Sequence, residues 1–556
     1  MTSVKSGFTR VLPIALVAAL AAAPAAAASN VNATASARKA IAAALGTSTP
    51  IPAQTPVKAG YTRTRFSIPI TINPGQNINK LTWSVPKPPG NFYLVRMQPN
   101  LVLADSDSNP NNDRVPRTDI IHLHHMVWID GSNRGPNGFK LPFGAGEEKT
   151  VVTLPDGYGY PVYSDQSWII NDMIHNLTPA TIKAKIIYDL DWTPMESTLG
   201  QSLKAAYPLW LDVQRGSGYP VFNTFKGTGS NGTITFPDQF SSPYSGLNTP
   251  NIWTADRNLT LIGTAGHVHP GGLYTDLQMI RAGANGSASP QPGTQANATR
   301  LFRSNAVYYD PAGPISWDMS MEGTPANWKI QVKTGDKLKI TATYDTNKGS
   351  WYESMGIMVV WAQLDGTDGV DPFTTATNWD KGVVTHGAYL ENKYYGGKIT
   401  TLNDPARLAN GPTPTDNTIK IKDFIYQRGD LSLNKRSISA RPPVIKQGQQ
   451  LTFLNLDAPG LSAPDKDQYK SIYHSITDCK SPCNKETGMS YPLANGSMIF
   501  DSGQLGFSPS IGRTGIVGSA AAERLTWKTP ADLTPGSYTY FCRVHPFMRG
   551  AFRVVK

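Results

Sequence analysis

Short runs in which apolar and polar residues alternate are the feature that most limits what this chain can fold into. Such runs recur between residues 61 and 364, and in one of them Ile182, Ala184 and Ile186 alternate with lysines. A period of two gives a strand one face for a core and one face for solvent. The 50 glycines and 44 prolines supply turns between such strands. The chain is therefore predicted to be all-β, and a helical bundle is excluded.

The strand pattern also suggests how the chain divides into domains. Its 556 residues are too many for one hydrophobic core. The first strand-rich region is long enough for two jelly-roll-like β-sandwiches, predicted over residues 59–240 and 241–364, with the boundary in a segment rich in Ser and Pro. Residues 365–415, rich in Gly, Thr, Asp and Pro, predict an extended connection, and a new series of strands fills residues 416–556.

The beginning of the chain predicts an export signal peptide over residues 1–28. Lys5 and Arg10 form its basic start, residues 11–23 are apolar, and a run of alanines follows for cleavage. The apolar stretch is too short to span a membrane comfortably, so no membrane span is expected after the signal is removed. We expect a periplasmic or secreted protein, with residues 29–58 as a linker.

The charge of the chain excludes one class of partner. The formal net charge is +11, but the excess lysines and arginines are not gathered into runs and no nucleic-acid-binding motif accompanies them. A generally basic, solvated surface explains the charge, and nucleic acid is not an expected partner.

The three cysteines form an odd number, which requires an explanation in an exported protein. Cys479 and Cys483 flank a short Lys-Ser-Pro turn, whereas Cys542 stands alone. The simplest account is a disulfide between Cys479 and Cys483 and a metal-binding thiolate at Cys542. The alternative for Cys542 is a leftover reactive thiol.

The surroundings of Cys542 favour a metal. Cys542, His545 and Met548 lie on one short loop between two strand-like runs, and His474 lies far upstream. Two imidazoles and a thiolate in a trigonal arrangement, with a weak axial thioether, make a blue copper site. The thiolate and thioether suit Cu(I) and the imidazoles suit both oxidation states, so the predicted role is electron transfer.

The C-terminal region resembles the plastocyanin-type cupredoxins. Its loop Cys542-x-x-His545-x-x-Met548 is similar to the short ligand loop of amicyanin. The resemblance implies a Greek-key β-sandwich over residues 416–556, one type 1 copper ion and a redox partner that donates or accepts electrons. An insert over residues 478–491 departs from that family, and the predicted disulfide would pin it near the copper.

Histidine is the residue whose distribution is most uneven. Six of the nine histidines fall in three clusters: His122, His124 and His125; His175; and His267 and His269. In an extended strand His267 and His269 point to the same face, and so do His122 and His124. His125 points the other way unless the strand bulges. Three clusters together favour metal ligands over isolated polar residues.

This pattern resembles the copper type II monooxygenases, which include peptidylglycine hydroxylating monooxygenase and dopamine β-monooxygenase. Members have two β-sandwich subdomains with one copper ion each. The His-His-Met motif of the family matches His124-His125-Met126, and the third ligand of that subdomain would be His175. His122 is an extra histidine that could replace His124 or His125 as a ligand. By resemblance, this first copper stores and passes an electron.

The second copper site that the resemblance implies is the catalytic one. The His-x-His pair of the family matches His267 and His269, and its Met ligand would be Met355, with Met358 as the alternative. By resemblance, copper held there binds O2 and abstracts hydrogen, and the thioether favours Cu(I). The region has no cysteine, whereas the family is rich in disulfides, and the residues that anchor the family's substrates are not matched. The substrate class therefore does not carry over.

Three functions compete at this point. The first is an exported copper monooxygenase, acting on a small organic substrate, with its electron donor fused at the C-terminus and with one type 1 and two type 2-like copper ions. The second is a non-enzymatic periplasmic copper-binding or electron-transfer protein. The third is a β-sandwich binding module whose histidines hold zinc or nothing. A multicopper oxidase would need repeated His-x-His pairs, and a copper nitrite reductase a second cupredoxin signature.

Overall fold

The computed structural model describes residues 49–50, 55–73, 76–103, 113–116, 118, 121–130, 141–178, 180–213, 222–224, 227–237, 251–282, 297–309, 319–348, 351–375, 382–385, 408–431, 441–457, 474–479, 499–503, 505–506, 525–543, 545 and 548–556. The predicted signal peptide lies outside these residues, as do Cys483 and His386.

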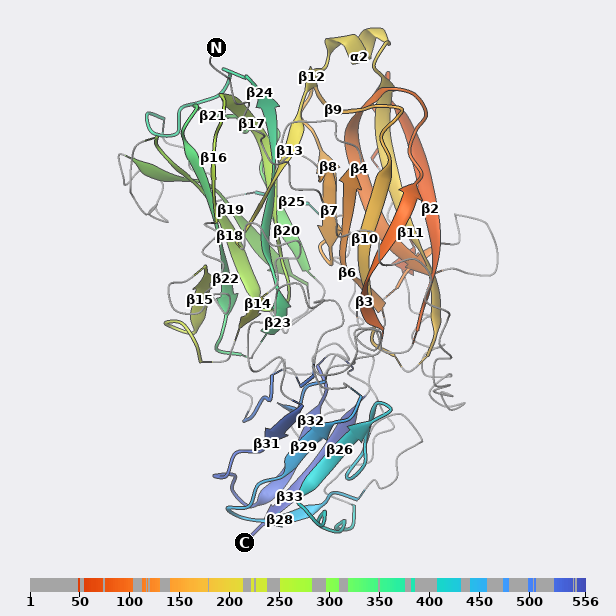
Figure 1. The fold of residues 1–556 in the computed structure, drawn as a ribbon, viewed down its shortest axis with the longest axis vertical. Helices are drawn as coiled ribbons and strands as arrows, with labels where there is room; N and C mark the ends of the chain where they lie inside the picture. The colour runs from red at the N-terminus through yellow and green to blue at the C-terminus, as the bar shows by residue number, and fades with distance from the viewer. Residues whose placement is uncertain are drawn as a thin grey trace, which may run out of the picture.

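Three β-rich bodies make up the described chain, two sandwiches side by side and a smaller domain at one end of both (Figure 1). The all-β prediction is confirmed. Among the described residues one short helix occurs, α2 (Thr198–Ser202), which is capped by Ser197. The Ser197 hydroxyl accepts a hydrogen bond of 2.9 Å from the backbone N–H of Gly200. No described helix is long and apolar enough to cross a membrane.

Two facing sheets form the first sandwich. The outer sheet contains β1 (Thr49–Pro50), β2 (Thr62–Ile72), β4 (Phe92–Leu103), β5 (Arg114–Val115), β8 (Val152–Thr153), β9 (Tyr158–Val162), β11 (Ile182–Pro194) and β12 (Lys204–Ala205). The inner sheet contains β3 (Asn77–Val85), β6 (Ile121–Asp130), β7 (Phe143–Gly146) and β10 (Trp168–Asn176). The alternation predicted for β11 places one face of the strand in the core, where Ile182, Ala184 and Ile186 are buried between the sheets.

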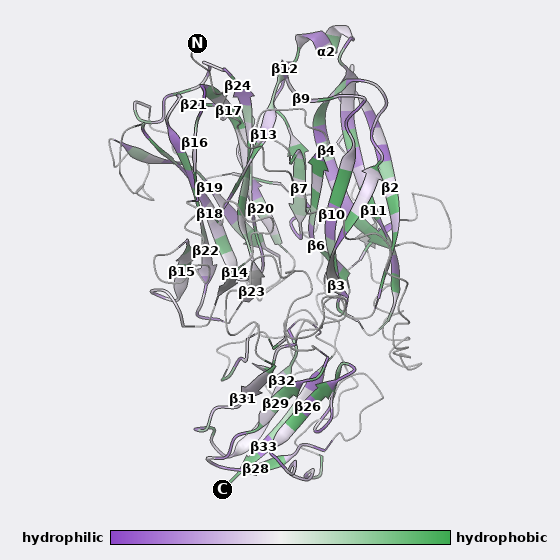
Figure 2. Cartoon of the chain, in the orientation of Figure 1, coloured by the Kyte–Doolittle hydropathy of each residue, from purple (hydrophilic) through white to green (hydrophobic). Residues whose placement is uncertain are grey.

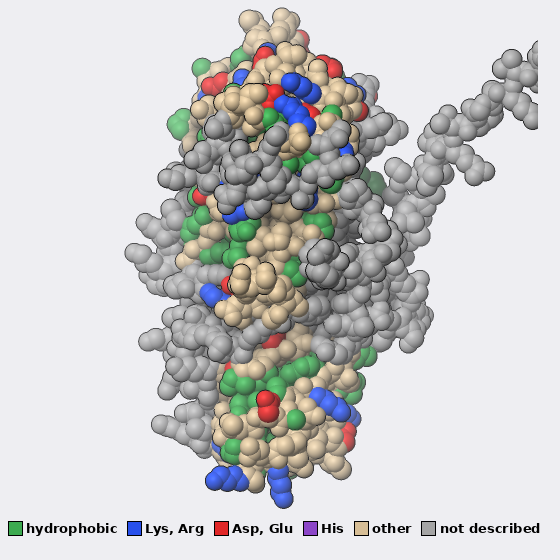
Figure 3. Space-filling view, turned by 90° about the vertical axis from the view of Figure 1, so that its left-hand side faces the viewer, with side chains coloured by type: hydrophobic (Ala, Val, Ile, Leu, Met, Phe, Trp, Pro, Cys, Tyr) green, Lys and Arg blue, Asp and Glu red, His purple; other side chains and the backbone are tan. Residues whose placement is uncertain are grey.

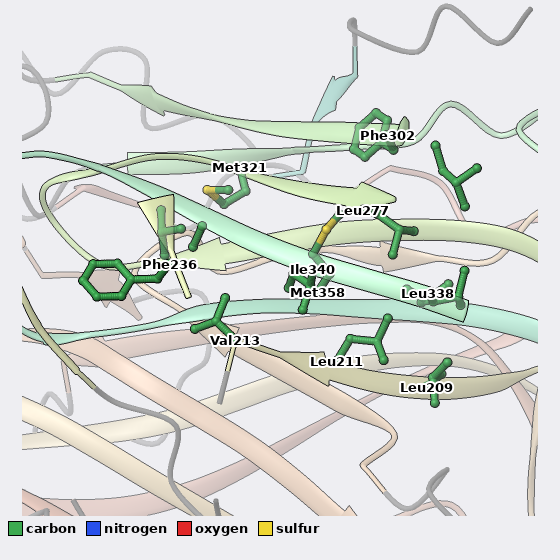
Figure 4. Close-up of a cluster of buried hydrophobic side chains, with 14 of the residues drawn as sticks. Leu209, Leu211, Val213, Phe236, Leu277, Phe302, Met321, Leu338, Ile340 and Met358 are labelled. Carbon is green, nitrogen blue, oxygen red and sulfur yellow. The ribbon is translucent and has the colours of Figure 1, made fainter. Parts of the chain in front are cut away.

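One long sheet that curls on itself forms the second sandwich. It contains β13 (Tyr207–Asp212), β15 (Thr233–Phe236), β16 (Ile252–Thr254), β17 (Leu259–Val268), β18 (Gly272–Ile280), β19 (Ala298–Tyr308), β20 (Met319–Gly323), β21 (Ile330–Val332), β22 (Lys337–Asp345), β24 (Gly356–Leu364) and β25 (Val383–Val384). β14 (Phe222–Thr224) pairs separately with β23 (Trp351–Ser354). Figure 4 shows part of the core, in which Leu338 and Ile340 of β22 lie near Met358 of β24.

The predicted boundary at residue 240 is too late. β13 pairs with β24, Tyr207 opposite Ala362, and β15 pairs with β22, Thr233 opposite Asp345. The strands between residues 207 and 236 therefore belong to the second sandwich. The pairing depends on hydrogen-bond partners more than a hundred residues away, which no local pattern reveals.

The C-terminal domain has two four-stranded sheets. One contains β26 (Thr418–Lys422), β27 (Ile425–Tyr426), β29 (Thr452–Asn455) and β31 (Thr526–Lys528); the other contains β28 (Val444–Lys446), β30 (Thr477–Cys479), β32 (Gly536–Phe541) and β33 (Arg549–Val555). Phe453 and Tyr540 meet in the core between them, with ring centroids 5.1 Å apart. Figure 2 shows apolar and polar residues interleaved along the strands of all three bodies.

The three bodies are packed against one another through buried side chains. Ile262 and Trp361 of the second sandwich belong to the apolar cluster of the first. Cys479 and Phe541 of the C-terminal domain belong to the cluster of the second sandwich. Each of these apolar clusters is therefore continuous across the boundary between two bodies.

Candidate metal centres

The predicted copper ligands of the C-terminal domain converge on one point. Cys542 follows β32, His545 lies in the next turn, and His474 lies beside Leu505, with which it exchanges backbone hydrogen bonds. The Cys542 Sγ atom is 3.8 Å from His474 Nδ1 and 3.6 Å from His545 Nδ1, and the two Nδ1 atoms are 3.2 Å apart. Three soft or borderline donors that face one another in this way fit a type 1 copper ion.

Backbone hydrogen bonds hold this loop in place. Met548 is fully buried, and its N–H donates to the carbonyl of His545 at 2.8 Å. The N–H groups of Ser475 and His545 each lie 3.4 Å from Cys542 Sγ and donate to it. Burial favours the neutral thiol, but the contacts with His474 and His545 outweigh it and lower the pKa of Cys542 well below its usual value. The thiolate, the form that binds metals, is therefore favoured.

A carboxylate behind His474 completes this site. Asp457 Oδ2 lies 2.8 Å from His474 Nε2, the ring nitrogen that faces away from Cys542. Asp457 in turn accepts hydrogen bonds from the backbone N–H groups of Asp423, at 2.6 Å, and Phe424, at 3.1 Å. A carboxylate in this position fixes the orientation of a metal-binding imidazole and makes it a stronger donor. No local motif marks Asp457, so the sequence does not predict its role.

The N-terminal histidines of β6 share one face because the strand bulges. Met173 of β10 pairs with His125 and Ile174 pairs with Leu123, so His124 is the extra residue. The ring nitrogens Nδ1 of His124 and His125 are 3.5 Å apart. The bulge reverses the alternation that would otherwise send them to opposite faces. The sequence contains a sign of this bulge. The core residues of β6 are Ile121, Leu123, Met126 and Trp128, and the spacing of three residues between Leu123 and Met126 interrupts a regular spacing of two.

His175 lies apart from His124 and His125. It is directly opposite His122 in the pairing of β10 with β6, and the two ring centroids are 5.1 Å apart. On its other side, the His175 ring lies 5.9 Å from the ring of His545. The predicted trio of His124, His125 and His175 is thus divided between β6 and β10, and His175 pairs with His122. His175 and His122 therefore lie between His545 of the C-terminal domain and His124.

The two predicted N-terminal sites meet at the interface of the sandwiches. The ring of His124, from the first sandwich, lies 4.1 Å from the ring of His269, from the second. The Nε2 atoms of His269 and His267 are 3.0 Å apart. Glu147, in the turn after β7, brings a carboxylate within 4.8 Å of donor atoms of both His124 and His269. No motif marks Glu147, so the histidine, cysteine and methionine pattern of the sequence does not predict its place here.

A second carboxylate positions His267. Glu148 Oε2 lies 3.0 Å from His267 Nδ1, and Glu148 Oε1 accepts a hydrogen bond from the backbone N–H of Gly146 at 2.8 Å. Burial would raise the pKa of Glu148, but the charge and hydrogen bond of His267 hold this pKa below its usual value. This arrangement favours a proton on His267 Nδ1 and directs the lone pair of Nε2 toward His269.

Of the two predicted methionine ligands, one faces the histidines. Met355 lines the same cavity as His267, whereas Met358 is packed in the core of the second sandwich (Figure 4). The Tyr344 hydroxyl donates to the carbonyl of Met355 at 2.6 Å. It also accepts hydrogen bonds of 3.0 Å from the N–H groups of Met355 and His269. Tyr344 therefore fixes the backbone of Met355 relative to that of His269.

A cavity of about 490 Å³ opens beside this cluster, between the two sandwiches. Its polar wall includes His125, Glu148, Asn171, Asp212 and His267. Its apolar wall includes Val127, Ile129, Leu141, Phe143, Trp210, Val359 and Trp361. A mainly apolar cavity with a few convergent polar groups is the usual form of a small-molecule site.

Burial keeps His124 and His125 neutral. It lowers the pKa of His125 to about 3, and the neighbouring His267 lowers it further. Burial likewise lowers the pKa of His124 well below its usual value, with His269 as the next cause. Neutral imidazole is the form that binds a metal ion.

Among the described residues no histidine reaches the face of the molecule shown in Figure 3, where basic and acidic side chains are interspersed.

Comparisons with known proteins give no family for this chain. No family model matches it, and no curated protein matches it. Among solved structures, it is similar to a copper-containing nitrite reductase from Thermus scotoductus SA-01, with 12% identity, a TM-score of 0.14 and coverage of 56% of this chain and 60% of that one. It is also similar to the infectious bursal disease virus VP2 subviral particle, with 11% identity, a TM-score of 0.17 and coverage of 59% and 78%. These likenesses are too weak to argue function, and the site itself must do so.

Proposed function

We propose that this protein is an exported, copper-dependent oxidoreductase whose cupredoxin domain exchanges electrons with a histidine-rich centre between the two sandwiches. The observation that carries the proposal is a continuous series of imidazole rings. Its successive centroid distances are 5.9 Å from His545 to His175, 5.1 Å to His122, 6.3 Å to His124, 4.1 Å to His269 and 4.8 Å to His267. Copper ions at the two ends would supply one-electron chemistry.

The reaction that fits this arrangement is monooxygenation of a small organic molecule with O2, as the resemblance to the copper type II monooxygenases implies. The cavity of about 490 Å³ has room for such a molecule, and its apolar wall would exclude water from it. His267 and Met355 line the same cavity, so a bound substrate would lie beside the predicted catalytic residues. Glu148 would keep the proton on His267 Nδ1 during the reaction.

The test is the return of the blue absorption after reduction. The copper-loaded protein is reduced without oxygen and then mixed with O2, and the reoxidation of the cupredoxin site is followed. In a His175→Phe variant we expect the blue spectrum to be unchanged and the reoxidation to be slowed by about tenfold or more. Ile174→Val is the matched control, because Ile174 neighbours His175 but belongs to the core of the first sandwich.

Two outcomes would count against the proposal. Equal reoxidation rates in His175→Phe and Ile174→Val would remove His175 from the electron path. A reduced wild-type protein that consumes no O2, with a panel of apolar substrates present, would favour the non-enzymatic alternative, a periplasmic copper-binding or electron-transfer protein.

A further inference from the structure

Glu147 is a carboxyl group buried at the interface of the sandwiches. Its side chain is 2% exposed, and neither carboxylate oxygen has a hydrogen-bond partner among the described residues. A carboxyl group that is buried without a hydrogen bond destabilises the fold, so such a position needs a compensating ligand.

We infer that Glu147 is a metal ligand and that it holds one divalent transition-metal ion together with His124, His267 and His269. Donor atoms of Glu147, His124 and His269 already lie within 4.8 Å of one another. His267 Nε2 lies 3.0 Å from His269 Nε2. Two nitrogens bound to one ion at about 2.0–2.1 Å are roughly 3 Å apart, so this pair has the spacing of ligands to a shared ion.

The ion joins the two sandwiches. His124 and Glu147 come from the first sandwich, and His267 and His269 come from the second. One shared ion replaces the two separate N-terminal copper sites that the sequence predicts, and it deepens the proposed function by giving the histidine-rich centre its ligands. Because a ligand from each body is needed, metal binding would stabilise their association.

Glu148 acts on this ion through His267. It lies 3.0 Å from His267 Nδ1 and would orient the ring in the way that Asp457 orients His474. His267 and Glu148 also line the cavity, so this side of the ion faces the space that a substrate would occupy. Glu148 is a positioning residue, whereas Glu147 is a ligand.

The experiment is copper binding to the metal-free mature protein, measured by competition with a chelator and by thermal unfolding. We expect Glu147→Gln to weaken the interface copper by more than about 100-fold and Glu148→Gln by about 10- to 100-fold, because partners of ligands usually matter less than ligands. Copper should raise the Tm of the wild type, and this rise should be lost in Glu147→Gln. The blue spectrum should be unchanged in both variants. Glu322→Gln, on β20, is the control carboxylate.

A pair of histidine variants tests whether the ion is shared. His124→Asn and His269→Asn should each lose one copper ion per chain, and the double variant should lose no more than either single variant. Two separate sites would instead lose two ions in the double variant, which would overturn the inference. The gel-filtration profile and the blue spectrum of each variant show that it has folded.

The inference and the proposed function fail separately. If Glu147→Gln binds the interface copper as tightly as Glu322→Gln does and shows the same rise in Tm, Glu147 is not a ligand, whatever the reaction with O2. If Glu147→Gln loses the copper but the wild type never consumes O2, the shared site stands and the oxidoreductase function falls.

Discussion

Two carboxylates, Asp457 and Glu148, have the same relation to two different histidines. Each carboxylate lies within hydrogen-bonding distance of the ring nitrogen that faces away from the other donor atoms. Asp457 lies 2.8 Å from His474 Nε2, and Glu148 lies 3.0 Å from His267 Nδ1. Such a partner fixes the ring and its tautomer. The repetition in two unrelated parts of the fold supports the interpretation that both histidines bind metal.

A third buried carboxyl group, Asp172 on β10, gives a prediction about pH. Its side chain is 5% exposed, and burial raises its pKa to about 6, against the opposing effect of Lys80. A folded-state pKa above the unfolded-state value of 3.8 means that ionisation opposes folding. The contribution of Asp172 to stability is therefore greatest below about pH 4, and it falls as the pH rises toward 6.

Replacing Asp172 by Asn should remove this penalty. We expect the free energy of unfolding of Asp172→Asn, relative to that of the wild type, to be greater at pH 7.5 than at pH 4 by about 1–3 kcal/mol. Urea unfolding at the two pH values measures the difference. Asp532→Asn, at an exposed position, is the control. A difference that does not change with pH would show that Asp172 is not ionised at a cost in the folded protein.

At the scale of elements, the end of β7 is shaped to approach β17. Gly146 is the last residue of β7, and a Cβ atom there would fall on the His267 ring and within 2.7 Å of Glu148 Oε2. Only a residue without a side chain lets Glu147 and Glu148 reach the histidines of the other sandwich. The β6 bulge at His124 does the same from the neighbouring strand, because it turns His124 toward His269.

We expect Gly146→Ala to displace His267 and to weaken the interface copper by about tenfold or more, since overpacking typically costs 1–3 kcal/mol. The type 1 spectrum should not change. Chelator competition measures the affinity. Gly263→Ala on β17 is the matched control, because its Cβ would meet Thr324 Oγ1 at an ordinary 3.6 Å. Equal affinities in the two variants would contradict the role given to Gly146.

At the scale of the whole molecule, a buried arginine holds the C-terminal domain against the second sandwich. Arg543, next to Cys542, is 1% exposed and pairs with Asp501 at 2.8 Å. Its guanidinium group lies 5.2 Å from the ring centroid of Trp351 in the second sandwich. A desolvated cation–π contact contributes about 2 kcal/mol, so this contact holds the copper loop against the sandwich.

Removing the aromatic ring should loosen this docking. In Trp351→Leu we expect the blue absorption at room temperature to be unchanged but to disappear at a lower temperature on heating. Trp253→Leu on β16, in the same apolar cluster, should lower the unfolding temperature of the sandwich with a smaller effect on the blue band. Equal shifts of the blue band in the two variants would show that Trp351 acts only through the stability of the sandwich.

The sequence by itself determined the fold class and the residues that could bind a metal. Alternation over β11 predicted a strand, because a period of two is a local property of the chain. Cys542, His545 and Met548 could be recognised as a set because they lie within one loop, and His474 was found with them. The structure brings the Cys542, His474 and His545 donors together.

Only the tertiary structure decided which histidines meet. The contact between His124 and His269 joins residues far apart in the sequence and depends on the packing of one sandwich against the other. Glu147 carries no motif, and its importance follows from burial without hydrogen bonds, which a sequence does not record. The pairing of β13 and β15 with late strands likewise moved the domain boundary. Local patterns fix strands and loops, whereas sites between bodies are fixed by long-range packing.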